Sequence, residues 1–304
     1  MKRFLGFLPA MLLLVAPVQG QNFSQLYVFG DSMSDMGNIF AATSGITPAP
    51  PFVDGRFSNG PVYVEGLAEV LGLAPLQPSN LGGTNFAWAG AKAADDISLL
   101  GGLLFLPSVQ TQVASYLSTL AGGAADGDGL YVVFGGNSDI DLGLEEGLDG
   151  TSGEPMAKAA AAGIVAAVGQ LAAAGAGHIL VINVPDIGIT PQHVNSAGAS
   201  QLSVLFNEEL AAGLAGIDGA DIKHFDIFTF LNEQRSNFLV NDAQCFNEST
   251  GEVCDNPEDY LFFDDFHPTQ NAHRVLALGL AALYQDTAIS LDTWGAVKRG
   301  FVGF

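Results

Sequence analysis

The feature that most constrains the fold is the alternation of short apolar runs with longer stretches of helical periodicity. The apolar runs predict strands at 25–30 (QLYVFG), 129–135 (GLYVVFG), 178–183 (HILVIN) and 222–228 (IKHFDIF). Helices are expected at 61–71, 155–175, 202–214 and 268–283. Continuous apolar strands separated by helices are typical of a parallel sheet covered on both faces. With no internal repeat and no long linker, the pattern predicts one α/β domain.

Three of the expected strands run directly into polar clusters. These clusters are Gly30-Asp31-Ser32, Gly135-Gly136-Asn137 and Asn183-Val184-Pro185-Asp186. The carboxyl ends of parallel strands share one edge of a sheet, where ligands bind in folds of this kind. Ser32 is therefore either an ordinary turn residue or a nucleophile held at that edge.

The amino terminus is typical of a secretory signal peptide. Lys2 and Arg3 precede an apolar run from about residue 4 to residue 15, which is too short and too interrupted by proline for a membrane span. We expect residues 1–20 to be this signal and residues 21–304 to form a single domain, in a secreted or periplasmic protein.

The charge balance of the chain limits the kinds of partner that it could bind. Ten Lys and Arg residues face 32 Asp and Glu residues, for a net charge of −22. This excess of negative charge argues against nucleic acid and against anionic membrane surfaces. The Ala-rich stretch 157–176 comes closest to a second apolar span, but Lys158, Gln170 and its glycines favour a soluble helix. No stable membrane span is expected.

The chain has only two cysteines, Cys245 and Cys254. In an exported protein such a close pair predicts one local disulfide. Two cysteines cannot complete a structural zinc site, and no histidine stands at ligand spacing beside them, so no metal is expected.

A serine nucleophile needs a base, and His267 is the best candidate. It lies in FFDDFHPT, with Asp264 three residues upstream. This spacing lets the carboxylate fold back, fix the ring tautomer and leave the other nitrogen free. Alone, the pattern equally fits a capped helix entry. The remaining histidines are expected in structural or surface positions, with His273 facing solvent or the sheet.

An acyl-transfer site also needs donors for a developing oxyanion. The candidates are the Ser32 backbone N–H, a glycine N–H within LGGTNFAWAGA (residues 81–91) and the side-chain amide of Asn137. Taken singly, Gly82-Gly83 and Asn137 are also ordinary turn residues.

Together and in order, these blocks resemble the GDSL family of SGNH hydrolases. The matching blocks are Phe29-Gly30-Asp31-Ser32, Gly83-Thr84-Asn85-Phe86-Ala87, Gly135-Gly136-Asn137 and Asp264-x-x-His267-Pro268-Thr269. The segment GRFSNG (55–60) and the cysteine pair before the last block are also family-like. The resemblance covers about residues 24–285.

The resemblance implies a three-layer α/β/α fold with a mainly parallel five-stranded sheet, flavodoxin-like in arrangement. It implies Ser32 as the nucleophile, His267 as the base and Asp264 as the residue that orients it. The Ser32 N–H, the Gly83 N–H and the Asn137 amide are implied as the oxyanion hole.

Two departures from the family pattern stand out. The nucleophile motif reads GDSM, with Met33 in place of leucine. The third block reads GGNSD, so Ser138 stands where the family usually has aspartate and Asp139 follows one place later. Ser32 is not in a G-x-S-x-G elbow, which distinguishes it from the α/β-hydrolase nucleophile.

The leading hypothesis is a secreted serine ester hydrolase that needs no cofactor, is monomeric and acts on a small-molecule or lipid ester. The alternatives are acyl transfer to another alcohol, deacetylation of a polysaccharide, and a non-catalytic secreted binding protein that keeps the fold. Residues 39–58 and 94–108 are expected to flank the site. The second segment, rich in leucine, either lines an acyl pocket or packs on the core.

Overall fold

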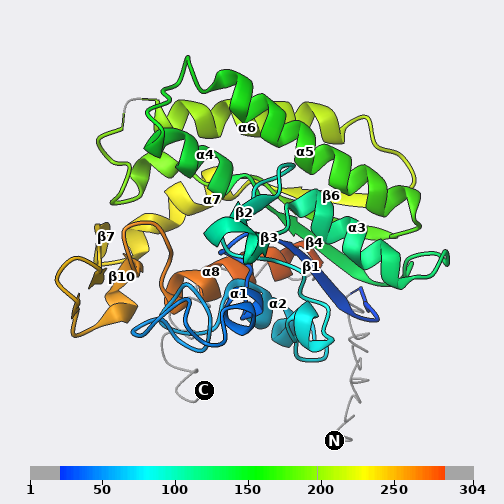
Figure 1. Ribbon diagram of the computed structural model, residues 1–304, viewed down its shortest axis with the longest axis horizontal. Coiled ribbons are helices and arrows are strands. Elements are labelled where there is room, and N and C mark those ends of the chain that lie inside the picture. Colours follow the sequence, from blue (N-terminus) through cyan, green and yellow to red (C-terminus); the bar gives the residue numbers. More distant parts are fainter. Residues whose placement is uncertain (1–20, 197, 285–304) are drawn as a thin grey trace, which may run out of the picture.

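The computed structural model describes residues 21–196 and 198–284, so the predicted signal peptide lies outside the described residues. Its centre is a parallel sheet with the strand order β1-β4-β5-β6 (Figure 1). The strands are β1 (Leu26–Gly30), β4 (Leu130–Phe134), β5 (His178–Ile182) and β6 (Asp221–Phe225). All four match predicted apolar runs.

Helices cover both faces of this sheet (Figure 1). One face packs against α3 (Val109–Thr119), α5 (Glu154–Ala173) and α6 (Ala199–Leu214), and the other against α2 (Tyr63–Val70) and α8 (Gln270–Ala281). This confirms the three-layer arrangement expected from the sequence.

The two cores follow from the period-two geometry of a strand. Phe29 and Val133 point into the core shared with α3, α5 and α6. Val28 and Val132 point into the core shared with α2 and α8. Because both faces are covered, β4 is buried at every position, which explains its uninterrupted apolar sequence.

The position of the expected fifth strand is taken by an extended segment beside β1. Thr84 accepts a hydrogen bond from Val28 N–H (3.0 Å), and Phe86 N–H donates to Val28 (2.7 Å). Trp88 N–H donates to Gly30 (3.0 Å). With β1 this segment forms one parallel bridge, between Val28 and Asn85. On its outer edge Asn85 bridges to Pro78, and the Asn38 amide donates to the carbonyls of Asn85 and Ala87.

The remaining elements are short and lie around the edge of the sheet that carries Ser32 or on its flanks. The helices are α1 (Asn38–Ala42), α4 (Asn137–Glu145) and α7 (Ile227–Gln234). The strands are β2 (Ile97–Leu99), β3 (Leu104–Leu106), β7 (Val240–Gln244), β8 (Phe246–Asn247), β9 (Glu252–Val253) and β10 (Tyr260–Phe262). Short 3-10 turns lie at Ser79–Leu81, Leu100–Gly102, Ile187–Ile189, Arg235–Asn237, Pro257–Asp259 and Ala282–Tyr284.

One predicted strand was wrong at its end. The run 222–228 suggested a strand to Phe228, but β6 stops at Phe225 and Asp226 begins a helix. The Asp226 side chain accepts the N–H of Thr229, which caps α7. A capping aspartate inside an apolar run was the signal for this change from strand to helix.

Candidate active site

Ser32, His267 and Asp264 form a continuous hydrogen-bonded chain. The His267 Nε2 atom lies 2.9 Å from Ser32 Oγ, and its Nδ1 atom lies 2.6 Å from Asp264 Oδ2. Asp264 is buried, and its Oδ1 atom also accepts the backbone N–H groups of Phe266 and His267. A carboxylate at Nδ1 favours the tautomer that leaves the Nε2 lone pair facing the serine hydroxyl.

The end of β1 brings Ser32 to this position. A Cβ atom on Gly30 would lie only 2.2 Å from the carbonyl oxygen of Phe134, so the strand can end beside β4 only with glycine there. Gln112 fastens the same residue by accepting Gly30 N–H (2.8 Å) and donating to Gly30 O (2.9 Å). Ser32 then lies two residues beyond the strand.

The electrostatics of His267 favour its charged form. Burial alone would lower the pKa of His267, but the charge of Asp264 and its hydrogen bond outweigh burial and raise the pKa above the ordinary histidine value. The negative charge of Asp31 acts in the same direction. The ring can therefore take up a proton from Ser32 and hold it.

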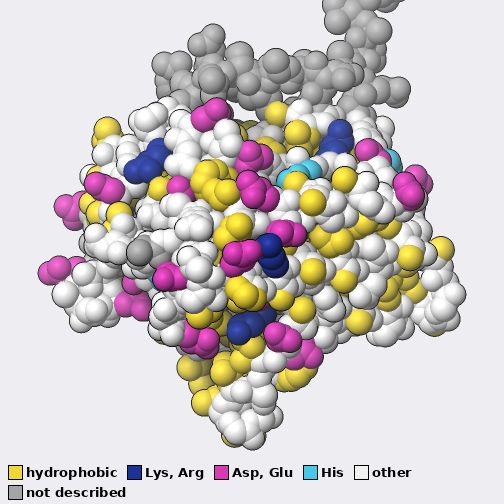
Figure 2. All heavy atoms as spheres, turned by 90° about the horizontal axis from the view of Figure 1, so that it is seen from above, with side chains coloured by type: hydrophobic (Ala, Val, Ile, Leu, Met, Phe, Trp, Pro, Cys, Tyr) yellow, Lys and Arg dark blue, Asp and Glu magenta, His cyan; other side chains and the backbone are white. Residues whose placement is uncertain are grey.

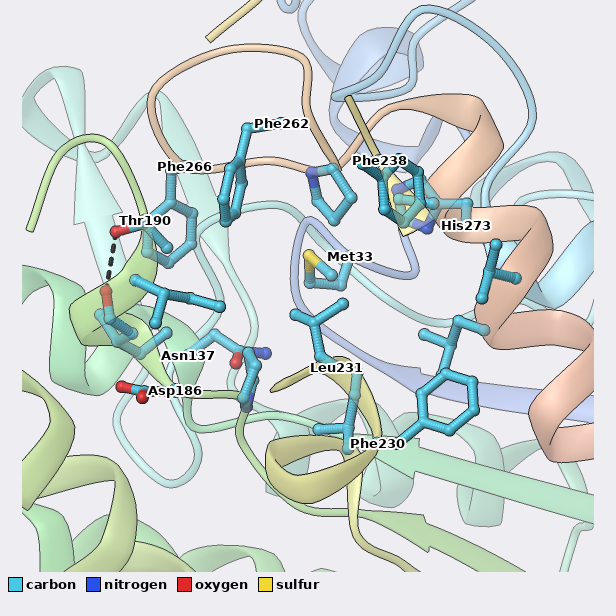
Figure 3. Close-up of a pocket in the computed structure, with 18 residues that line it drawn as sticks. Met33, Asn137, Asp186, Thr190, Phe230, Leu231, Phe238, Phe262, Phe266 and His273 are labelled. Carbon is cyan, nitrogen blue, oxygen red and sulfur yellow. Dashed lines mark hydrogen bonds between the residues drawn. The ribbon is translucent and has the colours of Figure 1, made fainter. Parts of the chain in front are cut away.

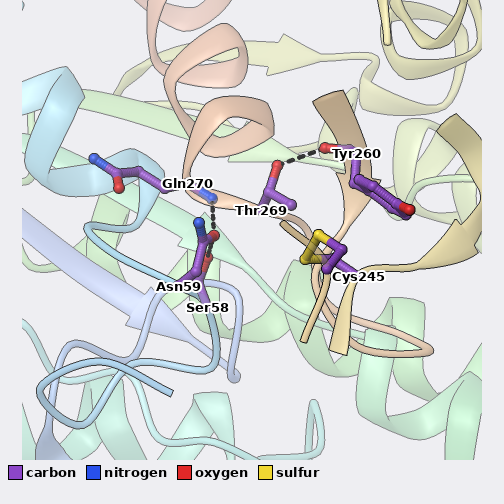
Figure 4. Close-up of a disulfide and its surroundings, with 7 residues drawn as sticks. Ser58, Asn59, Cys245, Tyr260, Thr269 and Gln270 are labelled. Carbon is purple, nitrogen blue, oxygen red and sulfur yellow. Dashed lines mark hydrogen bonds between the residues drawn. A yellow bond between two sulfur atoms is a disulfide. The ribbon is translucent and has the colours of Figure 1, made fainter. Parts of the chain in front are cut away.

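The segment 55–60 holds the His267 loop in place, although the sequence showed it only as a family-like signature. The Phe57 ring lies 5.1 Å from the His267 ring, centroid to centroid. Ser58 Oγ donates to the carbonyl of Pro268 (2.9 Å), and Asn59 Oδ1 accepts Gln270 N–H (2.7 Å; Figure 4).

The predicted disulfide between Cys245 and Cys254 is present (Figure 4). Cys245 N–H donates to the carbonyl of Phe262 (3.1 Å), and the next residue, Phe246, bonds to Phe263. The disulfide loop is thereby joined to the chain directly before Asp264. Its role is to stiffen the support of the candidate base.

Asn137 begins α4 directly after β4 and points at Asp31. Its Nδ2 atom donates to Asp31 Oδ2 at 2.9 Å. Asp31 is fully buried, and burial raises its pKa to about 6 despite the hydrogen bonds from Asn137 and from Met33 N–H. One amide hydrogen of Asn137 is thus used for orientation, and the second remains for another acceptor.

Gly83 is not brought near Ser32. Its N–H donates to the carbonyl of Pro78 (3.0 Å). Because Asn85 pairs with Val28, Gly83 lies level with Leu26 at the opposite end of β1, more than about 10 Å along the strand direction from Ser32. The family-based prediction of a Gly83 oxyanion donor is therefore corrected by the register of this segment.

The same register brings Gly90 to the level of Ser32. Trp88 N–H donates to the carbonyl of Gly30, the last residue of β1. Gly90, two residues after Trp88, therefore lies just past the carboxyl end of that strand. Gly90 has φ of +78°, which only glycine adopts easily. In the described part of the chain, neither Gly90 N–H nor Ser32 N–H has a protein acceptor. Within LGGTNFAWAGA the sequence offered Gly90 only as one glycine among several, and the register against β1 distinguishes it.

Asp139, the displaced aspartate of the third block, has a clear contact. Its Oδ2 atom accepts Ala93 N–H at 2.8 Å, and its pKa is raised to about 7 by burial. It therefore ties the start of α4, which carries Asn137, to the chain just after Gly90. Although this aspartate stands at position 139 instead of 138, its carboxylate still helps to position the start of α4.

A network of buried polar side chains joins the loop after Ser32 to the segment that carries Gly90. Asp35 accepts four backbone N–H groups, from Gly37, Asn38, Ile39 and Ala89. The Asn38 amide donates to the carbonyls of Asn85 and Ala87, both at 2.8 Å, and Asn85 donates to Ser34 O (2.7 Å). All three side chains are completely buried.

An apolar pocket adjoins the site (Figure 3). Met33, next to Ser32, and Asn137 line it on the side of the candidate nucleophile. The rest of the wall comes mainly from α7, α8 and the chain around β10, including Phe230, Leu231, Phe238, Phe262, Phe266 and Leu276. An aromatic and aliphatic wall of this kind suits a hydrocarbon group.

His273 also lines this pocket and is buried rather than solvent-facing. Burial lowers its pKa to about 3, so the ring is neutral. Its Nδ1 atom accepts Tyr63 N–H (3.3 Å), which places the ring proton on Nε2. Among the described residues, neither Nε2 of His273 nor Oδ1 of Asn137 has a hydrogen-bond partner.

A second serine–histidine–aspartate set lies nearby. His193 Nε2 is 2.6 Å from Asp141 Oδ1, and its Nδ1 is 3.3 Å from Ser196 Oγ. Ser196 follows no strand end, and its bond to histidine is longer than that of Ser32. The set fastens the loop after Thr190 to α4, so Ser196 provides a matched comparison for Ser32.

Residues 21–196 and 198–284 contain no group of three or more His, Cys, Asp or Glu side chains arranged to hold a metal ion. Within the same residues, one helix, α5, is long and apolar enough by composition to cross a membrane. Half of its most apolar stretch is buried inside the protein, and core helices often have the same length and composition.

Comparison with known proteins identifies the family. Residues 26–280 match the GDSL-like lipase/acylhydrolase family, and the chain belongs to this family of enzymes that act on carboxylic esters. Lipase 1 of Photorhabdus luminescens is 27% identical over 91% of this chain, which spans only 53% of that protein. The phosphatidylcholine-sterol acyltransferase of Aeromonas hydrophila is 30% identical over 75% of this chain and 67% of its own length.

Two further matches carry the same family description in their names. A GDSL esterase/lipase of Arabidopsis thaliana is 26% identical, covering 89% of this chain and 92% of its own length. A lipolytic G-D-S-L family protein of Veillonella parvula is 16% identical, with a TM-score of 0.46 and coverage of 86% of this chain and 96% of its own.

The buried network predicts a loss of stability for Asn38→Ala. The substitution leaves the carbonyl of Ala87 without its donor, whereas the carbonyl of Asn85 keeps the N–H of Ser79. For one unsatisfied buried group, the free energy of unfolding should fall by roughly 1–3 kcal/mol, measured by urea denaturation. The exposed Asn195→Ala variant should change it by less than about 0.5 kcal/mol. Equal values for the two variants would contradict a structural role for the network.

Proposed function

We propose that this protein is a secreted serine carboxylic ester hydrolase that works through an acyl-enzyme on Ser32. The observation that carries the proposal is the hydrogen-bonded chain from Ser32 Oγ through His267 to Asp264. Family membership supports the reaction class, and the geometry supports the assignment of roles. The disulfide and the sequence of residues 1–20 support export.

In the first half-reaction, Ser32 Oγ attacks the ester carbonyl while its proton passes to His267 Nε2. Asp264 stabilises the resulting imidazolium and keeps the ring in position. The Ser32 N–H, the Gly90 N–H and the free amide hydrogen of Asn137 donate to the oxyanion. When the tetrahedral intermediate collapses, the protonated His267 gives its proton to the leaving alcohol.

In the second half-reaction, water attacks the acyl-enzyme with His267 again accepting a proton. The carboxylic acid leaves and Ser32 Oγ recovers its hydrogen. If another alcohol replaces water, the same steps give acyl transfer, the reaction named for the Aeromonas relative. The apolar pocket favours a hydrocarbon acyl group over the acetyl group of a polysaccharide ester.

The nucleophile assignment is tested by comparing the two serine–histidine–aspartate sets. Ser32→Ala should abolish hydrolysis of p-nitrophenyl butyrate and labelling by a fluorophosphonate probe, because the nucleophilic oxygen is gone. Ser196→Ala should retain both. Labelling of the Ser32→Ala chain would contradict the mechanism, and a wild-type chain that takes up no probe would favour the non-catalytic binding protein.

The pH dependence follows from the raised pKa of His267. The ring must be neutral to accept the serine proton, so kcat/KM should rise with pH through an apparent pKa above about 6.5. Asp264→Asn removes the charge that raises this pKa, so the acid limb should move to lower pH. The rate should fall by roughly 10⁴-fold because the tautomer is no longer held. An acid limb that stays in place would show that another group sets it.

The pocket predicts selectivity for acyl chain length. Leu231→Trp fills part of the pocket, so KM for p-nitrophenyl octanoate should rise by about 10-fold or more, whereas kcat/KM for the acetate ester should change little. Leu239→Trp alters a side chain that is 79% exposed and serves as the control. An equal loss with both esters would place the acyl chain elsewhere.

A further inference from the structure

The leucine-rich part of segment 94–108 was expected either to line an acyl pocket or to pack on the core, and only Leu106, Ile97 and Leu104 pack against a buried cluster. We consider the part from residue 97 to residue 106. It forms an antiparallel hairpin of β2 and β3, joined by a turn at Leu100–Gly102. Only Leu106 is buried in it, whereas Leu99, Leu100, Leu103 and Phe105 are exposed, Leu103 at 88%. In the described chain, four of the twelve exposed large hydrophobic side chains therefore lie within seven consecutive residues. Such clustering marks an interaction site more often than single exposed leucines do.

The hairpin stands on a firm base beside the candidate active site. Leu106 packs with Ile39 and Ala89, and a Cβ on Gly90 would lie 3.3 Å from its Cδ1 atom. Ser108 N–H donates to Asp96 Oδ1 at 2.8 Å, which closes the base of the hairpin. The support is thus the same segment that passes Ser32, so the tip projects from the rim of the site.

The apolar side chains surround the tip instead of forming one flat face. Ser98 pairs with Phe105 and Leu99 with Leu104, so Phe105 and Leu99 lie on opposite faces of the hairpin, and both are exposed. In Figure 1, β2 and β3 lie at the front of the molecule, and Figure 2 shows a projection with hydrophobic side chains on that side. A flat protein partner would cover one face only, but a fluid apolar medium can surround all of them.

The charges around the hairpin indicate which kind of lipid surface it could enter. Residues 97–106 carry no charged side chain, and the exposed Asp95 and Asp96 stand at the base. Anionic headgroups would be repelled by these carboxylates and by the net charge of −22. A neutral or zwitterionic surface carries no such penalty.

We propose that the hairpin 97–106 inserts into the surface of neutral or zwitterionic lipid aggregates and so places the site of Ser32 at the lipid–water boundary. The leucines and Phe105 enter the acyl region, while Asp95 and Asp96 stay at headgroup level. The idea rests on the proposed function only for the purpose of the insertion, since binding itself needs no catalysis.

The test measures binding in the Ser32→Ala chain by flotation with phosphatidylcholine vesicles. Leu100→Ser/Leu103→Ser should weaken partitioning by about 10-fold or more, because the two side chains make no core contacts and lose only their burial in lipid. The control is Leu81→Ser/Leu239→Ser, two leucines that are 66% and 79% exposed elsewhere. This control should bind like the parent chain, and phosphatidylglycerol vesicles should bind the parent more weakly.

Activity of the chain with Ser32 intact separates this inference from the proposed function. The hairpin variant should hydrolyse dissolved p-nitrophenyl butyrate normally but an emulsified ester more slowly. The inference would be overturned if both double variants partitioned equally, or if the parent bound phosphatidylglycerol more strongly. It would also be overturned if the hairpin variant had half the hydrodynamic mass of the parent, because that would show that the patch joins two copies of the chain. Normal flotation without any hydrolysis would instead overturn the proposed function alone.

Discussion

The structure depends most on the buried hydrogen bonds that join the loop after Ser32 to the segment beside β1. A fifth regular strand would satisfy its outer carbonyls by pairing with another strand. Here the amide of Asn38 donates to the carbonyls of Asn85 and Ala87, and the carbonyl of Asn85 also accepts the N–H of Ser79. The Asp35 carboxylate accepts N–H groups from both the loop after Ser32 and the segment beside β1, for example those of Asn38 and Ala89. Buried polar groups of this kind are costly unless every partner is present, so they specify one arrangement. That arrangement sets where Gly90 lies relative to Ser32.

Two buried carboxyl groups, those of Asp31 and Asp139, lie close to this region. Burial raises the pKa of Asp31 to about 6 and that of Asp139 to about 7, above the ordinary aspartate value. The folded chain therefore holds these protons more tightly than the unfolded chain. Their contribution to stability is present at low pH and is lost as pH rises through the raised pKa values. Hydrogen bonds from Asn137 and Ala93 reduce this loss, because they favour the ionised carboxylates.

Much of the fold and part of the candidate site could be predicted because they depend on local pattern. The four strands follow from apolar runs, and Ser32, Asp264 and His267 follow from strand ends and a D-x-x-H spacing. Gly83 was misplaced because a motif shows which residues occur together but not which N–H faces the serine. That requires the register of residues 84–88 against β1, which depends on side-chain contacts from Asn38, distant in sequence.

Hydrophobicity alone could not assign the two apolar features that bear on substrate. The run at 97–106 and the run at 227–231 are similar in composition, yet the first projects into solvent and the second lines the pocket beside Met33. The difference arises from what surrounds them: α7 lies over the edge of the sheet against α8, whereas the hairpin has only its base supported. The exposed apolar hairpin 97–106 and the apolar pocket beside Met33 both adjoin the site of Ser32. Together they suit an ester that comes from a lipid surface better than a freely soluble ester.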